Sequence, residues 1–216
     1  YYLLICGIYI LTYMQTGIAG IGIYYMTYIL GNPALLGTFS TAQMLPMIIG
    51  LAFTPALVKK MKGMYKVNLY GYFIALFFRI LFVIAGYMGN VPFMLVTLVG
   101  AGLGTSPLTG DLNALIAAAS DYTYRVTGKR VDGAMFSCSS LGIKVGGGVG
   151  TALSGVLLSL GGYVANAAEQ SASCINMLNF LYLWYPLITV ILLVVLLSQL
   201  KVEKANADWD AAHANR

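Results

Sequence analysis

The stretch "DYTYRVTGKRVDGAMFSCSSLGIKVGGGVG", residues 121–150, contains both kinds of sequence that make up this chain. It begins as a charged, polar loop and ends as an apolar segment rich in glycine, serine, isoleucine and valine. One charge, Lys144, lies well inside the apolar part, beyond the end of the loop at Gly133. Long apolar segments between charged loops predict helices that cross a membrane, and a lysine inside such a segment indicates a polar site within the bilayer.

The composition of the whole chain supports a membrane protein. Of its 216 residues, 59% are hydrophobic and 9% are charged, and the mean hydropathy is +0.81. A soluble domain carries about 25% charged residues. The three cysteines, Cys6, Cys138 and Cys174, have neither a disulfide pattern nor a metal-ligand spacing, so we expect them to be buried as small apolar side chains.

Six apolar runs are long enough to cross a bilayer, which requires about 20 residues. They cover residues 1–30, 34–58, 67–88, 92–119, 133–161 and 173–200. The sequence therefore predicts an all-α membrane protein in which residues 1–200 form a six-helix bundle. Residues 201–216 form a polar tail, which we expect to be disordered with His213 in solvent. The chain starts without Met and inside an apolar run, so we also expect a fragment that begins in the middle of a longer protein.

The connections between the runs differ in charge. Three of them, including Gly31–Pro33 and 162–172, contain no Lys or Arg. The opposite side has ten of the twelve basic residues: Lys59, Lys60, Lys62, Lys66, Arg125, Lys129, Arg130, Lys201, Lys204 and Arg216. This asymmetry predicts that both chain ends and the loop 120–132 are cytoplasmic, in a multi-pass protein of the cell membrane. The net charge of +5 thus reflects topology, and we expect no nucleic-acid partner.

Two of the runs share an unusual texture. The first contains "TGIAGIG" (16–22), and the fourth contains "GAGLGTSPLTG" (100–110). Membrane helices accept such Gly and Pro density where neighbouring helices or a water-filled cavity satisfy the backbone. Because these runs open each half of the chain, they indicate a three-plus-three repeat with two cavity-lining helices. Close packing between helices is the alternative explanation.

Three charged residues, Arg79, Asp111 and Lys144, lie near the middle of their runs. A charge at this depth costs at least about 2.5–3.5 kcal/mol, so each should face a partner or an aqueous cavity. Depth alone allows two ion pairs, Asp111–Lys144 and Asp111–Arg79. Such a pair either holds helices together or lines a substrate path. The bulky sequence "LFFRILF" around Arg79 is compatible with both of these roles.

The neighbours of Lys144 are small or hydroxylated. Gly142, Gly146, Gly150 and Ser154 recur every four residues, which allows close helix packing. Ser137, Ser139 and Ser140 add hydroxyl groups one or two turns away. A cation beside hydroxyl groups suits a polyhydroxylated ligand or a carboxylate.

The run from residue 121 to 163 resembles the signature of the glycoside-pentoside-hexuronide:cation symporters, the melibiose-permease-like branch of the major facilitator superfamily. The matching residues are Asp121, Tyr122, Thr127, Gly128, Arg130, Lys144, Gly146, Gly162 and Tyr163. The segments "YYMTYILGNP" (24–33) and "KKMKGMYK" (59–66) also resemble that family. The resemblance covers nearly the whole chain, as helices seven to twelve of a twelve-helix transporter.

This resemblance implies alternating access in a cavity between two six-helix halves, with sugar or glycoside uptake driven by Na⁺, Li⁺ or H⁺. It implies that Lys144 and Ser140 line the substrate cavity and that Asp121 and Arg130 belong to a cytoplasmic gate. With the depth of the charged residues in their runs, we add Asp111 and Thr109 to the candidate substrate-binding residues, and Arg79 as a candidate intramembrane charge partner. The resemblance also implies a partner, the absent N-terminal half, which holds most of the cation site, and no other cofactor. Thr109 stands where the melibiose branch has a sugar-stacking aromatic residue, which argues against melibiose but not against another glycoside.

Other functions remain to be weighed. A half-size transporter that acts as a homodimer would use the Gly142, Gly146 and Gly150 stripe as its interface. A carrier of a non-sugar organic acid would use the same charged residues, and a sensor would bind a ligand without transport. An enzyme is not expected, because the chain has neither an HExxH nor a GxSxG motif and its one histidine lies in the tail.

Overall fold

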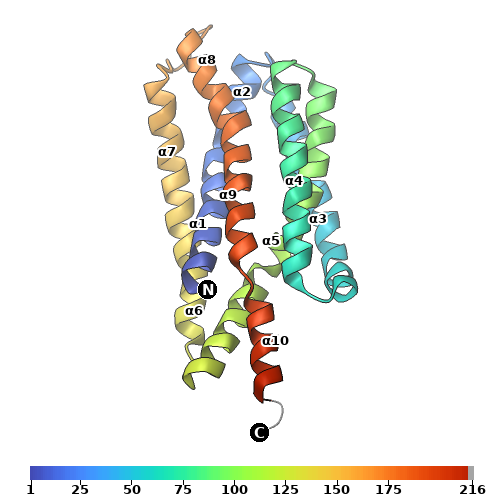
Figure 1. Cartoon of the computed structure of the whole chain (residues 1–216). Helices are drawn as coiled ribbons and strands as arrows, with labels where there is room; N and C mark the ends of the chain where they lie inside the picture. Colours follow the sequence, from blue (N-terminus) through green and yellow to red (C-terminus); the bar gives the residue numbers. More distant parts are fainter. Residues whose placement is uncertain (214–216) are drawn as a thin grey trace.

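The computed structural model describes residues 1–213, all of whose regular structure is helical (Figure 1). The first long helical segment consists of α1 (Tyr2–Ile18), the 3₁₀ turn η1 (Ala19–Ile21) and α2 (Gly22–Tyr28). The second, third and fourth segments are α3 (Leu35–Met61), α4 (Met64–Tyr87) and α5 (Val91–Thr127).

The last two long segments each contain a π-helical turn. The fifth consists of α6 (Asp132–Leu141), η2 (Gly142–Gly146) and α7 (Gly147–Leu160). The sixth consists of α8 (Ala172–Asn179), η3 (Phe180–Trp184) and α9 (Tyr185–Gln199), and α10 (Val202–His213) follows it. Six of the described helices are long and apolar enough to span a membrane, which confirms the predicted six spans.

Two sequence predictions are wrong. The loop expected over 120–132 is mostly helix, because α5 continues for 37 residues to Thr127 and ends where Gly128 adopts φ +69°. At about 1.5 Å per residue, α5 is about 55 Å long and exceeds the bilayer. The tail expected to be disordered forms α10 as far as His213, whose ring stacks on Trp209. Arg216, also in that tail, lies outside the described residues.

The contacts between helices are related by a symmetry between the first three spans and the last three. The first span packs against the fifth (α6, η2, α7) and the sixth (α9), while the fourth (α5) packs against the second (α3) and the third (α4). Exchanging spans one to three with spans four to six converts one set of contacts into the other. The expected repeat is therefore present in the packing.

The small-residue stripe of the fifth span lies against α1. A Cβ atom added at Gly146 would come 2.5 Å from the carbonyl oxygen of Ile10, and one added at Gly142 or Gly150 would collide with Tyr9 or Met14. These glycines thus allow close helix packing within the chain. A homodimer therefore cannot use this stripe as its interface while the bundle is intact.

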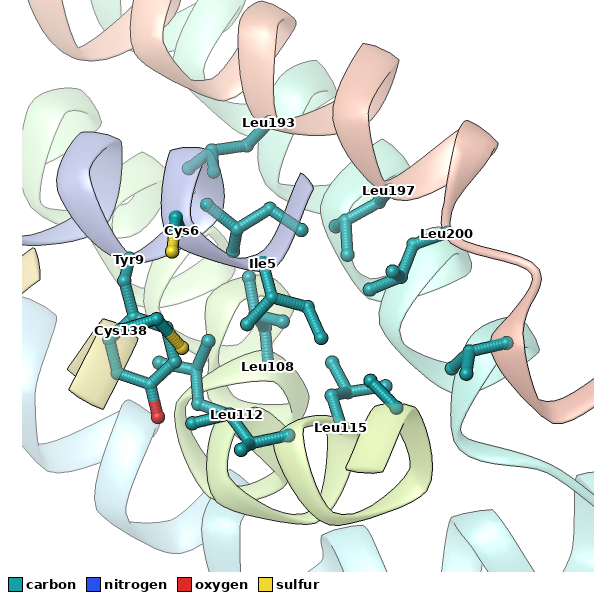
Figure 2. Packing of buried hydrophobic residues seen from close by; sticks show 14 of the residues in the cluster. Ile5, Cys6, Tyr9, Leu108, Leu112, Leu115, Cys138, Leu193, Leu197 and Leu200 are labelled. Carbon is teal, nitrogen blue, oxygen red and sulfur yellow. The ribbon is translucent and has the colours of Figure 1, made fainter. Parts of the chain in front are cut away.

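Apolar side chains from five spans form a common core, of which Figure 2 shows a part. Ile5 of α1, Leu108 and Leu112 of α5, and Leu193 and Leu197 of α9 are almost completely buried. Cys6, Cys138 and Cys174 are buried free thiols, as expected.

The outer surface has two different faces. The helices α4 and α9 lie toward the viewer in Figure 1. The exposed side chains in the middle of these two helices are all apolar and define the apolar face: Tyr70, Phe73, Ile74, Phe77, Ile80, Ile84, Ile188, Ile191, Leu192 and Val195. Seven exposed polar side chains of the first, fourth and fifth spans define the polar face: Thr16, Thr109, Asn113, Ser137, Ser140, Lys144 and Thr151. Hydrogen bonds hold these spans together, because the Tyr9 hydroxyl donates to Asn113 (2.8 Å) and Tyr2 contacts Ser137 (3.4 Å).

Candidate functional site

A cavity of about 470 Å³ opens on the polar face of the bundle, where its lining residues Thr16 and Thr109 are exposed. All spans except the fifth contribute to its wall. Its polar lining residues are Thr12, Tyr13, Gln15, Thr16, Ser40, Gln43, Tyr72, Arg79, Thr105, Thr109, Tyr182 and Tyr185. The volume falls within the range of about 300–1,000 Å³ that is typical of small-molecule sites.

The two glycine-rich stretches line this cavity, as the sequence predicted. Thr16, Ala19 and Gly22 come from the first stretch, and Thr105 and Thr109 come from the second. The threonine hydroxyls donate to their own helices, for example from Thr109 to the carbonyl oxygen of Thr105 (3.1 Å). Each hydroxyl oxygen therefore keeps acceptor capacity for a hydroxyl group of a ligand.

Arg79 supplies the cavity with a positive charge. It is 3% exposed, and its Nε is buried without a hydrogen-bond partner. Its guanidinium carbon lies 5.7 Å from the ring centre of Phe82. A desolvated cation–π contact contributes about 2 kcal/mol, which is less than the roughly 2.5–3.5 kcal/mol minimum cost of a charge at this depth. Phe82 alone therefore does not compensate the charge of Arg79.

An aromatic cluster fixes the wall beside Arg79. Tyr182 stacks on Tyr25, with ring centres 4.2 Å apart, and also contacts Phe82 at 5.8 Å. Tyr182 belongs to the π-helical turn η3, and such turns occur frequently at functional sites because they redirect side chains. The cavity thus has a rigid aromatic side and a side rich in amide and hydroxyl groups.

Lys144 and Ser140 lie outside this wall. Both are exposed on the polar face, and Lys144 is in the centre of the other π-helical turn, η2. Of the residues predicted to bind substrate, Thr109 lines the cavity and Lys144, Ser140 and Asp111 do not. The binding role of each of these four residues stays a prediction.

Asp111 makes neither of the two ion pairs that its depth allowed. It is buried between α4 and α5, where its carboxylate accepts a hydrogen bond from the Asn68 side chain (3.1 Å). The one ion pair found in residues 1–213 is Arg125–Asp210. The structure therefore separates Asp111 from both Arg79 and Lys144.

Asp121 and Arg130 share a surface depression at the end of the bundle that carries α10. The depression has a volume of about 590 Å³ and also contains Arg125, Trp209 and Asp210. Arg130 lies over the ring of Tyr124 (5.2 Å) rather than pairing with Asp121. The two residues predicted to form a gate are thus neighbours, and Arg125 makes the ion pair to α10 beside them.

Sequence reasoning did not identify Gln15, Gln43, Tyr72 or Tyr182 as cavity residues. Gln15 directly precedes the first glycine-rich stretch, and this position could have identified it as a cavity residue. The two tyrosines lie among many aromatic residues with no distinguishing spacing, and only the packing of α4 and η3 brings them to Arg79.

Comparison with known proteins gives a family match over nearly the whole chain. The family described as "MFS/sugar transport protein" matches residues 1–204. The isoprimeverose transporter of Lactiplantibacillus pentosus is 31% identical over 205 residues, which cover 93% of this chain and 42% of that protein. The uncharacterized symporter YnaJ of Bacillus subtilis is 31% identical over 161 residues (73% of this chain, 34% of that protein).

A putative sulfoquinovose importer of Salmonella typhimurium is 27% identical over 165 residues, which cover 76% of this chain and 34% of that protein. The chain therefore spans less than half the length of each of these three relatives.

Proposed function

Because the chain belongs to the MFS/sugar transport protein family, we propose that it forms the C-terminal half of a secondary transporter that takes up a sugar or glycoside by alternating access. The family match confirms the resemblance found in the sequence. The polar cavity of about 470 Å³ carries the proposal. Amide and hydroxyl groups on one side and tyrosine rings on the other suit the hydroxyl groups and apolar faces of a sugar.

The second half of the transporter is a further part of this proposal. Polar side chains such as Lys144, Ser140 and Asn113 lie on the outer surface of the bundle, where lipid contact would be costly. We propose that another six-helix unit covers the polar face and that lipid covers the apolar face. The ligands of the coupling cation, Na⁺, Li⁺ or H⁺, would then come mostly from that unit.

The orientation in the membrane follows from charge. The end of the bundle that carries α10 also carries the basic residues of the α3–α4 turn and the α5–α6 turn. Under the positive-inside rule this end faces the cytoplasm. Asp121 and Arg130 would then lie at the cytoplasmic entrance, where they would help to close it.

Sugar uptake by cells that express the full-length protein tests the proposed path. Gln43→Leu keeps the approximate side-chain volume but removes the hydrogen-bonding groups from the cavity wall. We expect it to reduce the initial uptake rate by about fivefold or more, since leaving a bound hydroxyl group without its hydrogen-bond partner costs about 1–3 kcal/mol. Gln199→Leu, at the exposed end of α9, is the matched control and should leave uptake unchanged. Normal uptake by a normally expressed Gln43→Leu variant would place the sugar path elsewhere.

Proteoliposomes test the coupling. An inward gradient of Na⁺, Li⁺ or H⁺ should drive sugar accumulation above the external concentration, and an ionophore for that ion should abolish accumulation. Equilibration of sugar without accumulation under all three gradients would contradict cation coupling.

A further inference from the structure

The turn between α3 and α4 carries a dense cluster of positive charge. Four lysines lie within eight residues, Lys59, Lys60, Lys62 and Lys66, and all four are exposed. The chain contains no acidic residue before Asp111, so no acid lies close to them in the sequence. Among residues 1–213, none of the four lysines pairs with a carboxylate. We call this positively charged segment, residues 59–66, the lysine turn.

One acid contacts the lysine turn from α10 and is already engaged. The two carboxylate oxygens of Glu203 accept hydrogen bonds from the backbone N–H groups of Met64 (2.9 Å) and Tyr65 (2.7 Å). Glu203 therefore caps α4 instead of pairing with a lysine. Because one carboxylate cannot balance four lysines, the lysine turn keeps an excess of positive charge.

Other basic residues at this end of the bundle have acids beside them. Arg125 pairs with Asp210, and Arg130 lines the same depression as Asp121 and Asp210. The charge of these arginines is therefore compensated within the chain. The lysine turn differs from them, and its excess charge favours an anionic partner from outside the described residues.

The helices on both sides of the lysine turn present apolar side chains next to it. In α3 every exposed residue between positions 44 and 57 is apolar, including Phe53 and Leu57. In α4 the first exposed side chain after Lys66 is Tyr70. At about 1.5 Å per residue, Phe53 lies about 9 Å along α3 from Lys59, and Tyr70 lies about 6 Å along α4 from Lys66. Charge and apolar surface thus follow each other along the helix axes.

A lipid with an anionic headgroup matches both parts of this surface. Clusters of about four to eight basic residues beside a membrane helix attract anionic lipids. Lysine side chains extend their ammonium groups to the headgroup level while their stems cover apolar surface. The acyl chains of the same lipid would then contact Phe53 or Tyr70. Figure 1 shows the lysine turn on the opposite side of the bundle from α6 and α7, which carry part of the polar face.

We propose that the lysine turn binds an anionic phospholipid of the membrane leaflet at the α10 end of the bundle. The four ammonium groups bind the phosphate-containing headgroup, and the exposed apolar side chains of α3 and α4 contact the acyl chains. The proposal is independent of which solute the cavity takes. The competing occupants are an acidic segment of the other six-helix unit and a free phosphate ion.

Photo-crosslinking of the full-length protein in proteoliposomes tests the proposal. A benzophenone amino acid replaces either Tyr70, beside the lysine turn, or Tyr87, a similarly exposed tyrosine at the other end of α4. Both leaflets contain a minor fraction of phosphatidylglycerol in phosphatidylethanolamine with the same acyl chains. Mass spectrometry gives the ratio of the two lipids crosslinked at each position. We expect this ratio at Tyr70 to exceed that of the vesicles by about fivefold or more, and at Tyr87 to equal it.

Removal of the lysine charges should remove the enrichment. The combined replacements Lys59→Gln, Lys60→Gln, Lys62→Gln and Lys66→Gln keep polar side chains at exposed positions and leave the Glu203 cap of α4 in place. We expect the lipid ratio at Tyr70 to fall to that of the vesicles. Lys129→Gln, at an exposed position of the α5–α6 turn, is the control and should leave the enrichment unchanged.

Four results would overturn the proposal. Equal lipid ratios at Tyr70 and Tyr87, or an enrichment that persists without the four lysines, would mean that the lysine turn does not select the headgroup. A crosslink from Tyr70 to polypeptide in place of lipid would assign the lysine turn to the other six-helix unit. Loss of the enrichment when inorganic phosphate replaces chloride at constant ionic strength would assign it to a free anion.

Discussion

Single glycines decide whether the first and fifth spans can pack. Gly146 faces α1, and an added Cβ would lie 2.5 Å from the Ile10 carbonyl oxygen and 3.1 Å from Cβ of Tyr13. Backbone cannot move away as a flexible side chain can. Gly148, two residues later, has no atom within 4 Å of the position that its Cβ would take. The two glycines therefore differ in environment although they share one sequence run.

This difference gives a matched pair of substitutions. We expect Gly146→Ala to lower the free energy of unfolding by about 1–3 kcal/mol, the usual cost of overpacking, and Gly148→Ala to leave it nearly unchanged. Thermal unfolding of the full-length protein in detergent measures both. Equal stability of the two variants would mean that α1 does not pack against η2 as described.

Among the polar residues, sequence reasoning gave positions but not partners. Depth in the apolar runs correctly selected Asp111 as a buried charge, yet its partner Asn68 is neutral and lies 43 positions away. Lys144 had the most informative neighbours in the sequence, but it lies on the outer polar face. A helical period does not show which of two polar directions is interior, because that depends on where the other helices sit.

The helical element that the sequence missed is α10. Its polar composition suggests disorder, but its contacts to two other helices stabilise it. Glu203 accepts hydrogen bonds from the backbone N–H groups of Met64 (2.9 Å) and Tyr65 (2.7 Å), and so caps the first turn of α4. The Asn206 side chain donates to the Ala118 carbonyl oxygen (2.8 Å), and Asp210 pairs with Arg125. These contacts span up to 139 positions of sequence separation and leave no local signal.

The contacts of α10 should differ in strength. The Glu203 carboxylate serves two otherwise unpaired N–H groups, and loss of such a cap costs about 0.5–2 kcal/mol. The Arg125–Asp210 pair is partly exposed, and exposed pairs contribute about 0–1 kcal/mol. We therefore expect Glu203→Ala to lower thermal stability more than Asp210→Ala does.

Thermal unfolding in detergent tests this order, with Glu169→Ala as the control. Glu169 is an exposed residue of the 162–171 connection, outside the helices. A larger effect of Asp210→Ala than of Glu203→Ala would contradict the capping role.

The sequence predicted the six spans well because length and hydropathy determine them locally. The texture of residues 16–22 and 100–110 also indicated the two cavity-lining helices. The extension of α5 to Thr127 was missed because its charged end resembles a loop, and the π-helical turns were missed because "GIKVG" and "FLYLW" contain no residue that requires them. These features depend on contacts between distant elements.

The whole molecule is asymmetric across its width. The apolar face on α4 and α9 matches lipid, whereas the polar face carries Lys144, Ser140 and Asn113 toward the outside. The proposed function requires this difference, because half of a transporter would face an aqueous path on one side and lipid on the other. In a bundle surrounded by lipid on all sides, such a polar face would be energetically unfavourable.

Accessibility of introduced cysteines to a water-soluble methanethiosulfonate tests this difference most directly, in native membranes and with Cys6, Cys138 and Cys174 replaced by alanine. Ser140→Cys and Thr109→Cys probe the polar face, and Phe73→Cys and Ile191→Cys probe the apolar face at exposed positions. We expect the first pair to react about tenfold or more rapidly, because only a thiol in contact with water ionises readily. Equal reaction rates at all four positions would contradict an aqueous path along the polar face.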